Sequence, residues 1–117
     1  MFREIIFFKT YYLDFIGELD ARARVKFDFL LEILRTRQFV PTNYAKHISG
    51  SDGIFELRVS IGSKEYRALF FFETGDLISG GRVVILGNGF LKKDNRDYKR
   101  AVELAQNIRD EFFGSKV

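Results

Sequence analysis

In the stretch "GIFELRVSIGSKEYRALFFFE", residues 53–73, hydrophobic residues alternate on both sides of a Gly-Ser pair. Alternation with a period of two is typical of a β-strand that buries one face. Two such runs separated by a two-residue loop containing glycine predict a tight β-hairpin. We therefore expect strands over residues 54–61 and 64–73, with Gly62 and Ser63 as the loop.

A two-residue loop also fixes the pairing of the two strands. It places Arg58 opposite Arg67, and Val59 opposite Tyr66. The side chains expected on the core face are Phe55, Leu57, Val59, Ile61, Tyr66, Ala68, Phe70 and Phe72. Those expected on the other face are Glu56, Arg58, Ser60, Glu65, Arg67, Leu69 and Phe71.

The pair of facing arginines has two interpretations. Like charges directly opposite each other destabilise a sheet, so Glu56 and Glu65 on the diagonals would neutralise them in a ladder of salt bridges. Alternatively, the two guanidinium groups hold a phosphate, since arginine donates two parallel hydrogen bonds to phosphate oxygens. In that case an exposed Phe71, with Leu69 beside it, offers an apolar surface for a nucleic-acid base or for an apolar side chain of a partner. The sequence leaves both interpretations open.

The rest of the chain supplies helices and two more strands. Helical spacing from residue 20 to 37 puts Ala23, Phe27, Leu30 and Leu34 on one stripe, which Phe29 and Ile33 widen. The predicted elements are a strand at 3–9, helices at 10–20 and 20–37, a strand at 82–90 and a helix at 94–113. Asp20 and Asp94 are the expected N-caps of the two long helices.

With a loop at 41–53 before the hairpin, the element order is β-α-α-β-β-β-α. This order predicts the α+β class, with a small, mostly antiparallel sheet and helices packed on it. The 117 residues suffice for a single domain, 1–117, with one hydrophobic core.

The composition excludes several kinds of site. The chain has no cysteine and one histidine, so neither disulfides nor a thiolate metal site is expected, and we predict no cofactor. The apolar residues that follow Met1 are interrupted by charge, which fits neither a signal peptide nor a membrane span. We therefore expect a cytoplasmic protein with no membrane partner.

Positive charge gathers where the strand ending at Phe90 gives way to the last helix. Residues 82–100 contain six Lys and Arg against two Asp. Lys92 and Lys93 follow the strand, and Arg96, Lys99 and Arg100 lie in the first turns of the helix. Cations there oppose the helix dipole, at about 0.3–1 kcal/mol each. Either they are simply solvated, or they bind an anionic partner. We read Gly87-Asn88-Gly89 as a bulge or kink.

Three short motifs resemble the RelE/ParE superfamily of toxins from bacterial and phage toxin–antitoxin pairs. They are Phe55-Glu56-Leu57-Arg58, Tyr66-Arg67 and Gly89-Phe90-Leu91-Lys92-Lys93, in this order. The segment "KHISGSDGIFELR" is similar to the approach to the first motif in the HigB-like, phage-associated branch. The resemblance extends over nearly the whole chain.

The resemblance implies a small fold with a curved sheet and a metal-independent endoribonuclease that cleaves mRNA in the ribosome. By position, Arg67 is the first candidate for stabilising the phosphate, followed by Arg58, Lys92 and Lys93, and His47 is a possible participant. Arg96, Lys99, Arg100 and Phe71 are then expected to bind RNA or the ribosome. The implied partner is a helix-turn-helix antitoxin.

Two other functions stay open on the same fold. One is a ParE-like inhibitor that binds DNA gyrase and cleaves nothing. The other is an RNA-binding module without cleavage, whose affinity would depend strongly on salt. Converging phosphate ligands at Arg58, Arg67, Lys92 and Lys93 favour the nuclease over the gyrase inhibitor.

Overall fold

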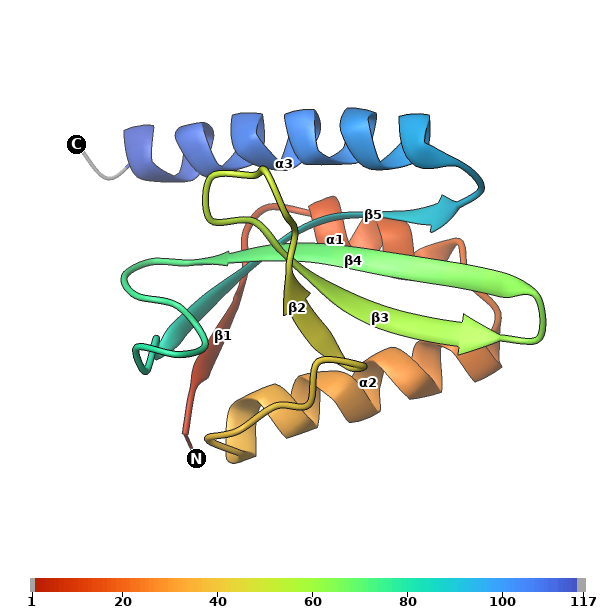
Figure 1. Ribbon diagram of the computed structural model, residues 1–117, viewed down its shortest axis with the longest axis horizontal. Coiled ribbons are helices and arrows are strands. Elements are labelled where there is room, and N and C mark those ends of the chain that lie inside the picture. Colours follow the sequence, from red (N-terminus) through yellow and green to blue (C-terminus); the bar gives the residue numbers. More distant parts are fainter. Residues whose placement is uncertain (1, 116–117) are drawn as a thin grey trace.

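The computed structural model describes residues 2–115 and shows a five-stranded sheet with helices on both faces (Figure 1). The elements are β1 (Glu4–Phe7), α1 (Tyr11–Gly17), α2 (Ala21–Thr36), β2 (Ala45–His47), β3 (Phe55–Ile61), β4 (Lys64–Phe72), β5 (Val83–Lys92) and α3 (Asn95–Gly114). The sheet order is β1-β5-β4-β3-β2, and only the β1–β5 pair among these strands is parallel. The predicted α+β class is confirmed.

The hairpin formed by β3 and β4 has the predicted register. Arg58 pairs with Arg67, Val59 with Tyr66 and Ile61 with Lys64. Gly62 in the loop has a positive φ of 59°, a conformation that glycine adopts without steric cost. The period-two pattern and the loop chemistry therefore specify this part of the sheet.

Strand β5 lies inside the sheet, between β1 and β4, as its unbroken apolar run predicts. Its pairing with β4 shifts by one residue between Ala68–Gly89 and Phe70–Leu86, which confirms the bulge expected around Gly87-Asn88-Gly89. A Cβ on Gly89 would lie 2.3 Å from the Phe15 ring of α1. The bulge region can therefore pack against α1 only with glycine at this position.

Strand β2 lies within the segment that we expected to be a loop. It is three residues long and pairs with residues 55–57 of β3 at the edge of the sheet. So short a run carries no readable hydrophobic period, which is why the sequence pattern missed it.

The sheet buries both of its faces. On one face, the predicted core side of the hairpin packs against α1 and α2, including Phe15 and Phe27. On the other face, α3 covers a second cluster of apolar residues. This cluster contains Ile54, Leu69, Phe71, Ile85, Ala101, Ala105, Ile108 and Phe112. The second face of the hairpin is therefore not open, contrary to our expectation, because α3 lies across part of it.

Both predicted N-caps are confirmed. The Asp20 carboxylate accepts a hydrogen bond from the Ala23 amide at 2.9 Å, and the Asp94 carboxylate accepts one from the Arg96 amide at 2.7 Å. Asp97 accepts from the Asp94 amide at 2.8 Å, which completes a capping box at the start of α3. These contacts fix where α3 begins, directly after the lysines that end β5.

A buried arginine joins the N-terminal strand to two loops. Arg3 donates to the carbonyls of Gly81 at 3.0 Å, Leu34 at 2.9 Å, Arg37 at 2.7 Å and Gln38 at 2.9 Å. Burial, and then the neighbouring charge of Arg82, lowers the pKa of Arg3. Carbonyls at the C-terminal end of α2 stabilise this cation, since the helix dipole is negative there.

Within residues 2–115, no helix is long and apolar enough to span a bilayer.

Candidate functional site

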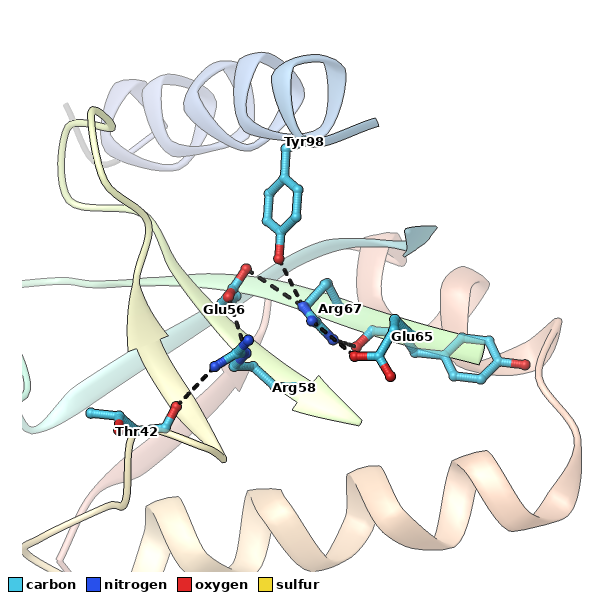
Figure 2. A network of polar contacts seen from close by, with 7 residues as sticks. Thr42, Glu56, Arg58, Glu65, Arg67 and Tyr98 are labelled. Carbon is cyan, nitrogen blue, oxygen red and sulfur yellow. Dashed lines mark hydrogen bonds and ion pairs between the residues drawn. The ribbon is translucent and has the colours of Figure 1, made fainter. Parts of the chain in front are cut away.

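Glu56 lies between the two facing arginines (Figure 2). Its Oε1 is 3.3 Å from Arg58 Nε, and its Oε2 is 3.8 Å from Arg67 Nε. Glu65 pairs with Arg67 of its own strand at 3.2 Å. Part of the expected salt-bridge ladder is therefore present, built on Glu56, and it offsets the repulsion between the arginines.

Arg67 is the buried centre of these contacts, with only 2% of its side chain exposed. It donates to the Tyr98 hydroxyl at 2.8 Å, to the Tyr66 carbonyl at 2.9 Å and to Glu65 at 3.2 Å. Burial alone would lower the pKa of Arg67, but the hydrogen bonds to Tyr98 and Glu65 and the charge of Glu56 outweigh it and raise the pKa. The guanidinium is thus a fixed cation whose donors point at protein groups.

Tyr98 lies in the first turns of α3 and contacts this network from the helix side of the sheet. Its ring meets the Phe90 ring edge-on at 5.2 Å, and Lys92 Nζ lies 5.4 Å from the Tyr98 ring centroid. Burial, and then the neighbouring carboxylate of Glu56, raises the pKa of Tyr98. We call Glu56, Arg58, Glu65, Arg67 and Tyr98 the Arg67 network.

The network has an exposed cationic margin. The side chain of Arg58 is 33% exposed and reaches the Thr42 carbonyl at 3.5 Å. Lys92 pairs with Glu65 in the β4–β5 register, so the end of β5 places this lysine beside the network. Lys46 of β2 pairs with Glu56 and therefore lies on the same face of the sheet. Cations from three strands thus lie on the same sheet face as the buried Arg67.

Lys46 and Tyr98 are the members of this region that the sequence reasoning missed. Lys46 lay in a segment assigned to a loop, so the sequence did not show on which face of the sheet its side chain lies. Tyr98 lies within the predicted last helix, where helical spacing alone does not show its polar contacts. A signal was available for Tyr98, since a buried tyrosine needs a hydrogen-bond partner and the opposite sheet face carried two arginines.

His47 does not join the Arg67 network. It pairs with Phe55 in β2–β3, and its ring meets the Phe55 ring edge-on at 5.2 Å. Phe55 belongs to the core on the α1–α2 side, whereas Arg58, three residues further on, points to the other face. His47, which the resemblance offered as a possible participant, therefore lies away from the arginines, because it is held in a strand with the opposite orientation.

Phe71 is not an exposed platform for a base. It is 1% exposed, and its ring packs against the rings of Phe112 at 5.8 Å and Phe113 at 6.1 Å in α3. Leu69 is buried in the same cluster. The expectation of an exposed pair was wrong because alternation shows which residues share a face, and not whether a later helix covers it.

The remaining cations lie at the surface, as expected. Lys93, Arg96, Lys99 and Arg100 are all exposed. Arg96 pairs with Asp94 at 3.1 Å, an ion pair of small energetic value because both groups are solvated. These side chains extend the positive surface from the end of β5 along the first turns of α3.

Residues 14–110 match a protein family described as phage-derived protein Gp49-like (DUF891). The chain belongs to this family. It is a family of RelE/HigB-like toxins in toxin–antitoxin systems, so the expected superfamily is confirmed. The matched region of this Gp49-like protein contains the whole Arg67 network and the cations at the start of α3. No curated protein and no solved structure matches the chain.

Proposed function

We propose that this Gp49-like protein is the toxin of a toxin–antitoxin pair, of the HigB-like branch, and that it cleaves mRNA on the ribosome. The observation that carries the proposal is the placement of Arg58, Lys92 and the Tyr98 hydroxyl around the buried Arg67. Two partly exposed cations beside a fixed phenol suit a phosphate that gains charge during the reaction.

The reaction needs no metal. The ribose 2′-hydroxyl gives its proton to water as its oxygen attacks the neighbouring phosphorus in line. The bond to the 5′-oxygen breaks and that oxygen takes up a proton, so a cyclic phosphate and a 5′-hydroxyl result. Arg58 and Lys92 bind the non-bridging phosphate oxygens, and Lys93 adds positive charge at the strand end. Arg58 suits this role because its planar guanidinium offers paired donors that match two phosphate oxygens, and its side chain is partly exposed.

Tyr98 is our candidate for the proton donor to the departing 5′-oxygen. A phenol is protonated at neutral pH, and an alkoxide is a much stronger base, so the proton can pass to the departing oxygen. Arg67 is then a positioning residue and not a phosphate ligand, because its side chain is buried and holds the Tyr98 oxygen at 2.8 Å.

Arg96, Lys99 and Arg100 are proposed to bind ribosomal RNA around the site. They are exposed and lie on the helix that directly follows Lys92 and Lys93. Contacts of this kind position an enzyme on its substrate without contributing to the chemical step. The proposed location is the cytoplasm, and the proposed protein partner is a helix-turn-helix antitoxin.

The burial of Arg67 supports a second candidate function, an RNA-binding module without cleavage. The guanidinium donates to Tyr98, Tyr66 and Glu65, so a substrate could reach it only after rearrangement. If Arg58 and Lys92 only bind phosphates, RNA would be held and not cut.

A direct test uses purified protein, ribosomes and an end-labelled mRNA. We expect cleavage within the coding sequence, products with a 5′-hydroxyl, and no cleavage of the same mRNA without ribosomes. Arg58→Gln should lower the single-turnover rate by about 10²–10³. Binding to ribosomes with intact mRNA would support the second candidate instead.

A further inference from the structure

A groove of about 400 Å³ lies between α2 and the free edge of β3. Within residues 2–115, β2 pairs only with residues 55–57 of β3, so no strand covers the edge from Val59 to Ile61. The groove is lined by Phe29, Leu30, Tyr44 and Val59, with Lys26 and Arg58 also in its wall. Its volume falls within the ~300–1,000 Å³ typical of small-molecule sites.

Two aromatic rings form one corner of the groove. Phe29 is 53% exposed, although helical spacing assigned it to the buried stripe of its helix. Its ring meets the Tyr44 ring at a centroid distance of 6.0 Å and an angle of 90°. A flat ligand can therefore stack on one ring while its edge meets the other.

Two cations adjoin this corner. Lys26 Nζ donates to the Ser60 carbonyl at 3.0 Å, and Arg58 donates to the Thr42 carbonyl at 3.5 Å. An ammonium has three donors and a guanidinium has five, so both groups keep donors for an anion. Arg58 also belongs to the Arg67 network, and it therefore connects the groove to the candidate site.

We infer that this groove binds one unpaired base of single-stranded RNA, adjacent to a phosphate held by Arg58. The inference rests on the proposed function, because it takes the cleaved strand as the ligand. Aromatic rings stack with every base, and neighbouring cations neutralise the backbone phosphates. An apolar ligand would leave Lys26 and Arg58 with no anion to bind, whereas a nucleotide uses both the rings and the cations. The side chain of Asn43, also in the groove wall, can hydrogen-bond to a base edge.

The test measures binding of a fluorescent, unstructured RNA hexamer to the full chain by anisotropy at low salt. Phe29→Leu should weaken binding about tenfold, since it removes the ring and keeps an apolar side chain. Phe39→Leu is the matched control, because Phe39 is 83% exposed and does not line this groove. This control should bind the RNA as tightly as the unmodified protein.

A set of hexamers with one abasic position provides a second measurement that needs no variant. At one position, removal of the base should weaken binding to the unmodified protein and change binding to Phe29→Leu little. Equal affinities of the Phe29→Leu and Phe39→Leu proteins would overturn the inference, as would equal losses at every abasic position in both proteins.

Failure of the groove and failure of the proposed function give different results. If the unmodified protein cleaves mRNA on ribosomes while Phe29→Leu binds and cleaves normally, only the groove assignment is overturned. If the unmodified protein does not bind the hexamer and leaves ribosomal mRNA intact, both proposals are wrong.

Discussion

Arg67 Nε donates a hydrogen bond of 2.8 Å to the Tyr98 hydroxyl, which connects strand β4 directly to helix α3. This hydrogen bond makes the position of the phenol depend on the arginine beneath it. The arginine in turn depends on Glu56 and Glu65 for compensation of its buried charge. A substitution at either residue is therefore expected to change both the stability of the fold and the proposed cleavage. Each such variant needs a separate measurement of its stability.

The Tyr98 hydroxyl should matter more for cleavage than for folding. Tyr98→Phe removes the proposed proton donor, and we expect cleavage on ribosomes to fall by about 10²–10⁴. The same change leaves a buried donor of Arg67 unpaired, at a cost of about 1–3 kcal/mol in the free energy of unfolding. Single-turnover cleavage and urea unfolding measure the two effects.

Tyr11→Phe is the matched control for this variant. The Tyr11 hydroxyl donates to Glu111 at 2.7 Å, near the other end of α3. Its removal should lower stability and leave cleavage unchanged. Similar losses of cleavage in the two variants would show that both act through helix packing and not through proton transfer.

The buried pair of Arg67 and Glu56 should be strongly coupled. Arg67→Met leaves the buried Glu56 carboxylate paired only with the partly exposed Arg58, and removal of one member of a buried pair costs up to about 3–5 kcal/mol. Adding Glu56→Gln to Arg67→Met should restore part of the stability, because it removes this under-compensated buried charge. Urea unfolding of the single and double variants gives the coupling energy. Additive losses would show that the two residues are energetically independent.

Cations at the end of β5 and in α3 should have different effects. Replacement of Arg96, Lys99 and Arg100 by Gln should weaken ribosome binding and lower its log–log salt slope by about one unit for each phosphate that the variant no longer neutralises. Replacement of Lys92 and Lys93 should mainly lower the cleavage rate at saturating ribosomes. Proportional losses of affinity and rate in both variants would mean that all five cations act as one electrostatic surface.

Alkaline pH should destabilise the fold through two tyrosines. Burial, and then the charge of Asp28, raises the pKa of Tyr12, and burial, then Glu56, raises the pKa of Tyr98. A raised pKa means that the folded state holds the proton more tightly than the unfolded state. This stabilisation is complete below the ordinary tyrosine pKa of about 10 and is lost as the pH rises above it. Urea unfolding between pH 8 and 11 should show the decline, and Tyr98→Phe should reduce it.

Sequence patterns predicted the hairpin register, the caps of the long helices and the bulge in β5 because each depends on neighbouring residues. The pairing of Arg58 with Arg67 follows from a two-residue loop alone. The Asp94 cap follows from the residues at the start of the helix. Such local rules do not require knowledge of where distant elements pack.

The covering of the second sheet face could not be predicted in the same way. Burial of Phe71 and Arg67 depends on how α3 crosses the sheet, which no local pattern specifies. The orientation of His47 depends on a three-residue strand that has no readable period. Consequently the sequence identified the arginine pair, while the role of Arg67 as a buried support for Tyr98 became visible only in the structure.

Mapping of mRNA 5′ ends after induction of the protein in a bacterial host tests the proposed cleavage most directly. We expect new 5′-hydroxyl ends inside translated frames, which should largely disappear in cells that contain equal amounts of folded Tyr98→Phe protein. Growth inhibition without new ends in mRNA would rule out the proposed cleavage. DNA breaks in place of such ends would indicate inhibition of gyrase.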